Sequence, residues 1–416
     1  MEKVRRVNFD YSAATPVDPE VLKAMVPFFT EMYGNPSSSH YMGKLAKETF
    51  SAAQNSVGKI IGAKNPKSEI YFTSSPTESN NLALSGVAFK NRKRGNHIVI
   101  SAIEHISVIN ISKYLERNGF HVTRIPVDCH GIVNIGALRD SITEKTILSS
   151  IMLANNEIGT VQPIDEIGKI TKESGVIMHV DATAAIGKVP VNVDRSGIDL
   201  ITIPSNDIHG PKGIGGLYVR DGTPIEPIIQ GGGQQNGLRS GSENIPGIVG
   251  MAKAADLAIE RMSSDSERIS RLRDRITTGI LESVDQTYLH GHPKNRLPSN
   301  AMMRVFGVEG ESIVMELDSH GVATSTGSVC ASKNLEPSHV LVAIGLNEIE
   351  RHGSIQFTLS RLNTDNEVDY LLSIMPKIVS KLRSLSPVWK FRDRLEEFYG
   401  SDNQEERHLD SIGSNH

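Results

Sequence analysis

Short apolar runs alternate with longer segments of helical period through the middle of the chain. Runs rich in β-branched residues predict buried strands, at 69–73, 97–101, 122–127, 146–153, 176–180 and 199–203. The segments between them predict helices near 78–92, 105–118, 135–142 and 163–174. This alternation is typical of an α/β fold whose mostly parallel sheet carries helices on both faces. Such sheets bind ligands beyond the carboxyl ends of their strands, so the residues that follow each strand are the first candidates for function.

The pattern changes after about residue 245, where long helical segments replace the alternation. The later part is predicted to form one or two long helices, a strand and a closing helix, at 245–281, 354–360 and 366–385. We expect a domain change between about 250 and 265. The predicted organisation is a large α/β domain, a smaller α+β domain built from two segments, and a polar, mobile tail, at 13–255, at 1–12 with 256–392, and at 393–416.

Composition narrows the function classes. The chain has 416 residues, of which 38% are hydrophobic and 22% charged, as in ordinary globular proteins. A net charge of -4 provides no basic field, so we expect no nucleic-acid partner. The chain contains two cysteines, which excludes a disulfide framework and a four-cysteine metal site built by one chain. No apolar stretch reaches about 18 residues, so we expect a cytoplasmic protein that does not span a membrane.

Polar residues follow several of the predicted strands. The segment 74–80 leads from a strand into a helix, and its backbone N–H groups could bind a phosphate or could serve only as a helix cap. His105 follows the next strand and is weak evidence when taken alone. Asp181 ends an apolar strand, where a carboxylate is costly to bury without a partner. That partner could be a protonated heterocyclic nitrogen or a neighbouring backbone group.

Two glycine-rich segments and the two cysteines remain to be interpreted. The segments 210–216 and 231–242 read as turns and lack the spacing of a Walker loop or a dinucleotide fingerprint. Cys330 lies in the small, polar segment 325–333, which predicts a loop with an exposed and movable thiol. Cys129 lies in a turn that matches no motif for a reactive cysteine, and it is interpreted as structural.

Longer motifs in order along the chain identify a family. They are Phe9-Asp-Tyr-Ser-Ala-Ala-Thr-Pro-Val-Asp18, Tyr33-Gly-Asn-Pro-Ser-Ser38, Thr77-Glu-Ser-Asn-Asn-Leu-Ala83, Glu104-His105, Asn155-Asn-Glu-Ile-Gly159, His179-Val-Asp-Ala-Thr183, Leu238-Arg-Ser-Gly-Ser242 and Leu335-Glu-Pro-Ser338. Together they resemble the cysteine desulfurases of the IscS/NifS type, which belong to the class V aminotransferases with the fold-type I architecture. The resemblance extends to about Pro387 and implies a seven-stranded-type sheet in the large domain.

The resemblance implies a homodimer that binds pyridoxal 5′-phosphate (PLP), an electron sink that is normally held by a lysine imine. By position, Thr77 would bind the phosphate, His105 would stack on the ring and Asn156 would contact its phenolic side. Asp181 would pair with the pyridine nitrogen. Ser242, where the family usually has Thr, would reach the phosphate of the neighbouring subunit.

The sequence departs from the family at several contacts with cofactor or substrate. Asp207 stands at the position of the Schiff-base lysine, and an aspartate cannot form an imine. Asn206 replaces the preceding histidine, and Pro204 replaces a phosphate-binding serine. Ala184 replaces a glutamine that contacts the cofactor, and Gln356 replaces the arginine that binds the substrate carboxylate. We expect unassisted turnover to be slow or absent, because general acid–base help alone typically contributes about 10²–10⁴-fold.

The position of Cys330 falls on the cysteine that carries a persulfide in the family. We therefore predict a protein of iron–sulfur cluster assembly or sulfur transfer in which Cys330 carries a persulfide or transiently ligates a [2Fe-2S] cluster shared with an IscU-type scaffold protein. One alternative is an active desulfurase that takes sulfur from L-cysteine with non-covalently bound PLP, with Lys212 as the imine lysine, or with a lysine borrowed from a partner. Another is a different enzyme on the same fold that uses Asp207 as a base. Lys212 lies in the glycine-rich turn, and its interpretation is structural.

Overall fold

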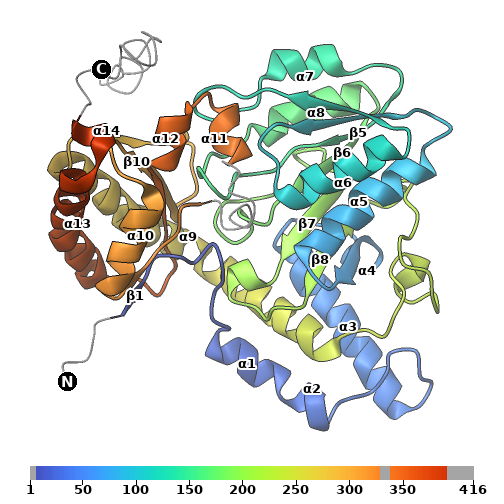
Figure 1. Ribbon diagram of the computed structural model, residues 1–416. Coiled ribbons are helices and arrows are strands. Elements are labelled where there is room, and N and C mark those ends of the chain that lie inside the picture. Colours follow the sequence, from blue (N-terminus) through green and yellow to red (C-terminus); the bar gives the residue numbers. More distant parts are fainter. Residues whose placement is uncertain (1–5, 328–337, 391–416) are drawn as a thin grey trace. The chain divides into compact units, whose positions relative to one another are not determined.

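The computed structural model describes residues 6–327 and 338–390. The chain divides into two compact units (Figure 1). The larger unit comprises Tyr11–Asn156 and Thr160–Arg268. The smaller unit comprises the described residues of Met1–Asp10, Glu157–Gly159 and Ile269–His416. The segment Glu157–Gly159 therefore belongs to the smaller unit, although the chain on both sides of it belongs to the larger one.

A seven-stranded sheet forms the centre of the larger unit. Its strands are, in spatial order, β2 (Ile70–Thr73), β8 (Gly215–Val219), β7 (Leu200–Pro204), β6 (Ile177–Asp181), β5 (Thr146–Ser150), β3 (His97–Ser101) and β4 (His121–Ile125). β8 runs antiparallel to both β2 and β7, and the other neighbours pair in parallel. The sequence predicted a strand at every one of these places except β8, which begins inside the segment 210–216 that was interpreted as a turn.

Helices cover both faces of this sheet. In Figure 1, α5 (Pro76–Lys90) and α6 (Ile106–Arg117) lie on one side of β5 and β6, and α7 (Ile135–Ser141) and α8 (Ile164–Glu173) lie on the other. Right-handed crossovers require this arrangement. The chain moves toward the β4 edge of the sheet from β3 to β4 and away from that edge from β4 to β5, so the helices of these two connections must lie on opposite faces. The remaining helices of this unit are α1 (Pro19–Met25), α2 (Pro27–Thr30), α3 (Tyr41–Lys59) and α4 (Pro66–Glu69), with short 3₁₀ turns η1 (Asn206–Ile208) and η2 (Gln235–Gly237).

Apolar side chains between α5, α6 and the sheet form a large core in this unit. Most of the middle of α5 is buried, from Ser79 to Ala88, and Asn81 is the one residue there that is partly exposed. A helix that is apolar all round is expected in the interior rather than at the surface. α5 begins directly after β2, so its amino-terminal residues lie at the carboxyl end of that strand, at the edge of the sheet where ligands are expected.

The smaller unit is built from two small sheets and several helices. Strands β12 (Ser354–Thr358), β10 (Asn300–Val305) and β9 (Thr287–Leu289) form an antiparallel sheet, and β1 (Val7–Asn8) pairs in parallel with β11 (Val322–Ala323). Helices α10 (Gly310–Ser319) and α13 (Asp365–Leu385) contribute to its core, with α11 (His339–Ala343), α12 (Glu348–His352) and α14 (Pro387–Lys390) completing the described part. Among the described residues, no helix is long and apolar enough to cross a membrane.

Helix α9 (Ile245–Ser283) is one continuous helix that contributes residues to both units. The division between the units falls between Arg268 and Ile269. The sequence predicted a domain change between about 250 and 265, and it left open whether one or two helices lie there. Apolar residues of its second half, such as Leu272 and Ile276, belong to the core of the smaller unit.

Candidate functional site

The carboxyl ends of β6 and β7 place two acidic residues in one region of the larger unit. β6 ends at Asp181, and β7 ends at Pro204, directly before the turn η1 that contains Asp207. Because β6 and β7 are parallel neighbours, these ends meet at the same edge of the sheet. Besides burial, the charges of Lys188, Asp181 and His105 influence the pKa of Asp207. The structure thus brings together three of the predicted site residues and adds Lys188, which the sequence analysis did not identify.

Hydrogen bonds fix the carboxylate of Asp181, which is 3% exposed. Its Oδ1 accepts from the backbone N–H of Thr183 at 2.9 Å and from the Thr183 hydroxyl at 2.6 Å. Its Oδ2 accepts from Nδ2 of Asn80 at 2.7 Å. Asn80 is itself held, because its Oδ1 accepts from the Thr202 hydroxyl at 2.6 Å. This carboxylate therefore has a defined orientation at the strand end, as pairing with a protonated ring nitrogen requires.

His105 is linked to the same network. It caps the amino terminus of α6, where its Nδ1 accepts from the backbone N–H of Ser107 at 3.2 Å and lies 2.7 Å from the Ser107 hydroxyl. The Ser107 hydroxyl also accepts from Nδ2 of Asn80 at 2.9 Å. Since a backbone donor occupies Nδ1, the neutral ring carries its proton on Nε2. Asn80 and Ser107 thus join His105 to Asp181, and neither was predicted.

A second histidine, His179, lies inside β6 and is fully buried. Its Nδ1 lies 2.8 Å from the Ser150 hydroxyl and its Nε2 lies 3.1 Å from the Thr202 hydroxyl. Burial lowers the pKa of His179 to about 4, and the nearby Asp181 opposes the shift only partly. His179 is therefore a neutral structural residue beneath the site at neutral pH.

Asp207 and Lys188 affect each other's ionisation. Burial raises the pKa of Asp207, and the charge of Lys188 is the main influence that opposes the shift. Burial lowers the pKa of Lys188, and the charge of Asp207 opposes that shift. The Lys188 ammonium donates to the backbone oxygen of Ala184 at 3.0 Å. The position of the expected imine lysine thus holds a carboxyl group, and the charge of Lys188, from another segment, acts on its pKa.

Lys212 has a different environment. It is exposed, and its amine donates to the backbone oxygen of Thr15 at 3.4 Å. Asn206 contacts the same segment, because its Oδ1 accepts from the Thr15 N–H at 3.4 Å and its backbone oxygen accepts from the Thr15 hydroxyl. These bonds fasten the turn around η1 to the segment before α1. They agree with a structural role for Lys212.

Two of the predicted phosphate ligands are accessible. Thr77 is exposed near the amino terminus of α5, where the Ser75 hydroxyl accepts from the N–H of Glu78 at 3.2 Å. Ser242 is exposed as well. Asn156 is partly buried at the end of its segment of the larger unit. A helix amino terminus favours an anion, so the position of Thr77 suits a phosphate.

In the smaller unit, Gln356 is buried in β12. Its Nε2 donates to the backbone oxygen of Glu157 at 2.8 Å, and its Oε1 accepts from the Ser325 hydroxyl at 3.4 Å. The Gln356 amide, at the position where the resemblance implies a substrate-binding arginine, is therefore engaged in bonds within this unit. Burial raises the pKa of Glu157 to about 7, partly offset by a hydrogen bond from Ser338. Cys330 and the rest of 328–337 lie outside the described residues.

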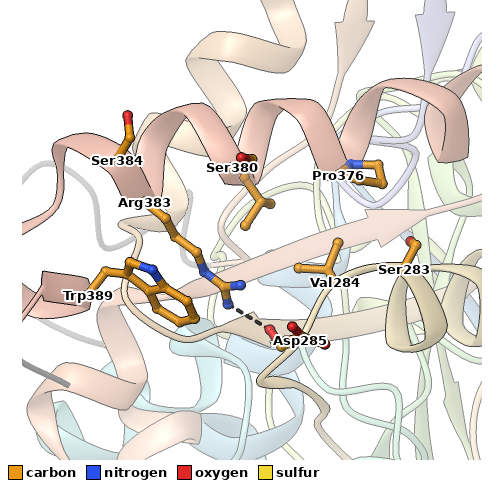
Figure 2. Close-up of a pocket in the computed structure, with 9 residues that line it drawn as sticks. Ser283, Val284, Asp285, Pro376, Ser380, Arg383, Ser384 and Trp389 are labelled. Carbon is orange, nitrogen blue, oxygen red and sulfur yellow. Dashed lines mark hydrogen bonds between the residues drawn. The ribbon is translucent and has the colours of Figure 1, made fainter. Parts of the chain in front are cut away.

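The smaller unit also has a surface hollow of about 380 Å³ beside the end of α13 (Figure 2). Figure 2 shows Arg383 between Trp389 and Asp285. Its guanidinium carbon lies 3.8 Å from the centre of the Trp389 ring, and Nη2 donates to the backbone oxygen of Asp285 at 2.7 Å. None of the predicted site residues lines this hollow. Because the Arg383 guanidinium donates to backbone oxygens, we interpret this arginine as a packing residue of the hollow and not as a ligand for an anion.

Comparison with known proteins shows the family of this chain. Residues 7–371 match the family described as aminotransferase class-V, and the chain belongs to that family. Within it, the chain is 50% identical over 382 residues to "Cysteine desulfurase IscS 1" of Archaeoglobus fulgidus, covering 92% of this chain and 99% of that protein. It is 46% identical over 384 residues to "Cysteine desulfurase IscS" of Methanosarcina thermophila, covering 92% and 94%.

The fold agrees with that assignment. A solved structure titled "NIFS-LIKE PROTEIN" superposes with a TM-score of 0.85 at 38% identity, and the match covers 91% of this chain and 100% of that one. The predicted resemblance to IscS/NifS cysteine desulfurases and the predicted α/β fold class are therefore confirmed.

Proposed function

We propose that this chain is a cysteine desulfurase-family protein of sulfur transfer and iron–sulfur cluster assembly whose lysine-dependent PLP chemistry is impaired. The observation that carries the proposal is the position of Asp207, in the turn that follows β7 and within electrostatic range of Asp181 and His105. A carboxyl group there cannot attach an aldehyde. In this proposal the protein works in the cytoplasm as a homodimer.

The residues present fit PLP. Asp181 is buried, oriented by Asn80 and Thr183, and matched to a protonated ring nitrogen. His105 lies in the same network with its ring position fixed by Ser107. The exposed amino terminus of α5 at Thr77 is suited to the phosphate, and Ser242 to the phosphate of a neighbouring subunit. When bound, PLP supplies an electron sink for bond cleavage at an amino acid.

Asp207 limits what this site can do with a substrate. The position holds a group whose pKa is raised by burial, rather than an amine that can exchange with a substrate amine. The loss of that amine also removes the base that moves the α-proton, a contribution of about 10²–10⁴-fold. Gln356 lacks the charge and the bidentate geometry with which arginine binds a carboxylate. Orientation of the substrate is therefore weakened as well.

Cys330 carries the remaining chemistry in this proposal. Its thiolate attacks the outer sulfur of a donor persulfide, so that a new S–S bond forms on Cys330 while the donor's S–S bond breaks and the donor leaves as a thiolate. Alternatively, the thiolate ligates a [2Fe-2S] cluster together with residues of an IscU-type scaffold protein. The partner must supply other ligands, because the chain has a single further cysteine, Cys129, and that residue is exposed at a turn. The relatives' name, cysteine desulfurase, supports L-cysteine as the original source of the sulfur.

The proposal is tested by sulfide release from L-cysteine, with PLP and a thiol reductant added and with Cys330→Ala as the control. We expect release from the native protein to be no greater than from the control. Release that depends on Cys330 and continues over many turnovers would instead show an active desulfurase, with PLP held non-covalently or by another lysine. Turnover that needs Asp207 but not Cys330 would indicate a different enzyme that uses Asp207 as a base.

A further inference from the structure

Met152 lies just past the end of β5, and its backbone N–H donates to a side chain instead of a neighbouring strand. The N–H groups of Ile151 and Leu153 continue the hydrogen bonding of β5 to β6. The N–H of Met152 points to the opposite side, because alternate residues of a parallel strand bond to opposite neighbours. On that side β3 has already ended at Ser101, and the acceptor is Oε1 of Glu104 at 2.8 Å. The carboxyl of Glu104 therefore takes the place of a strand carbonyl.

A second hydrogen bond holds the Glu104 side chain in this position. Its Oε1 also accepts from the Ser101 hydroxyl at 2.5 Å, and the residue is 0% exposed. Burial raises the pKa of Glu104 to about 8, so the group is mainly the neutral acid at pH 7. A neutral, hydrogen-bonded carboxyl is far less costly to bury than a charged one. Glu104 thus ties the end of β3 to the residues that follow β5.

Asn155 makes the reciprocal connection. It is 1% exposed, and its Nδ2 donates to the backbone oxygen of Ile103 at 2.9 Å. The same nitrogen lies 3.4 Å from Sδ of Met152. The segments 101–105 and 151–156 therefore each send one buried side chain to the backbone of the other. All of these contacts lie within the larger unit.

Each of the two connecting residues directly precedes a predicted cofactor contact. Glu104 precedes His105, and Asn155 precedes Asn156. We propose that Glu104 and Asn155 are positioning residues that fix the backbone at His105 and Asn156, so that these two side chains meet the same ligand ring. The inference rests on the proposed function, since the ring concerned is that of PLP. Glu104 and Asn155 act through their neighbours and do not touch the ring themselves.

The same unit offers a structural comparison in Gln54 of α3. This amide is also buried, and it donates to the backbone oxygens of Lys67 and Ile70 at 3.1 and 2.8 Å. Neither chain neighbour of Gln54 is a predicted site residue. Gln54→Ala therefore removes buried bonds to the backbone, as Asn155→Ala does, but it leaves the segments of His105 and Asn156 unchanged.

The test is the dissociation constant of PLP, measured by equilibrium dialysis with the full-length protein at pH 7. We expect Glu104→Ala and Asn155→Ala to weaken binding by about 10-fold or more, because small displacements of contact residues are costly. Glu104→Gln should stay within about twofold of the native protein, because its amide oxygen accepts the same two bonds as the neutral acid. Gln54→Ala should lower the urea midpoint of unfolding while PLP binding stays within about twofold.

Hydrogen exchange of the Met152 amide provides a second measurement, which needs no cofactor. This N–H should be protected in the native protein and in Glu104→Gln. In Glu104→Ala it should exchange about 10-fold faster or more, because its acceptor is lost. Asn155→Ala carries the binding test by itself if Glu104→Ala does not fold.

Several outcomes overturn the inference. PLP binding that stays at the native level in Glu104→Ala and Asn155→Ala would show a purely structural role, as would a loss in Glu104→Gln equal to that in Glu104→Ala. A native protein that binds no PLP would overturn it too, while leaving the proposed role of Cys330 intact. Conversely, the expected pattern in a protein whose Cys330 handles neither sulfur nor cluster would overturn the proposed function alone.

Discussion

At the residue scale, the candidate site is a hydrogen-bonded cluster around the buried Asp181. Asp181 and His105 could be proposed from the sequence, because acidic and aromatic residues after buried strands lie where α/β sheets bind ligands. Asn80 and Lys188 could not. Asn80 reads as an ordinary residue of a helix, and the carboxylate it binds is 101 positions away in the chain. Lys188 reads as a surface residue until its environment is known.

The substitution at Asp207 leads to the first prediction. Asp207→Lys alone should leave cysteine turnover about 10²-fold or more below that of a variant that also carries Asn206→His, Ala184→Gln and Gln356→Arg. The single change restores an amine but not the contacts that orient cofactor and substrate. Steady-state sulfide release from L-cysteine measures both. Equal rates in the two variants would show that the other replacements are without consequence.

The buried His179 leads to a prediction about pH. Its pKa in the folded protein is about 4, below the ordinary value of 6.5, so the unfolded chain binds a proton first as the pH falls. The stability from neutral His179 is present above pH 6.5 and is lost between pH 6.5 and 4. We expect this residue to contribute about 2 kcal/mol of the loss between pH 7 and pH 5. Urea unfolding at both values should show a correspondingly smaller loss in His179→Gln; an identical loss would contradict it.

At the element scale, the network of Asn80 links α5 to β6, β7 and α6. Its side chain bonds to Asp181 and Ser107, and it accepts from Thr202. Most elements of the larger unit were predicted correctly because long buried strands and helices have distinct periods. β8 was missed because its first two residues, Gly215 and Gly216, give the segment the composition of a turn. Pairing with β2 and β7, which local sequence does not encode, makes it a strand.

A substitution at Asn80 tests this linking role. Asn80→Ala should lower the free energy of unfolding by about 1–3 kcal/mol, because buried partners including the Asp181 carboxylate lose a hydrogen bond. Asn81→Ala, on the same helix, is the matched control, since its amide bonds to the Thr77 backbone oxygen near the surface. Its effect should stay within about 0.5 kcal/mol. Chemical unfolding of the two variants compares them, and equal losses would show that the network adds no stability.

At the scale of the whole molecule, the proposed function is sulfur or cluster handling without efficient desulfuration. The larger unit contains the buried Asp181, the fixed ring of His105 and the exposed amino terminus of α5, and Asp207 lies where the sequence analysis expects the family's lysine. The segment that contains Cys330 is outside the described residues, so its role rests on its position in the family's motif order. The molecule-scale question is therefore whether this thiol works independently of the cofactor site.

A comparison of two variants answers that question. Cys330→Ala should abolish persulfide acceptance from a sulfur donor, and cluster formation on a scaffold protein, while the dimer remains unchanged in size-exclusion chromatography with light scattering. Asp181→Asn removes a charge from the cofactor site and should leave both processes at native levels, because the thiol attacks a persulfide without needing the ring. Persulfide labelling of the protein and the visible absorbance of the scaffold's cluster measure the two processes. If Asp181→Asn lost them as fully as Cys330→Ala, the sulfur on Cys330 would have to come from cysteine processed at this chain's own cofactor site, and the chain would be a working desulfurase after all.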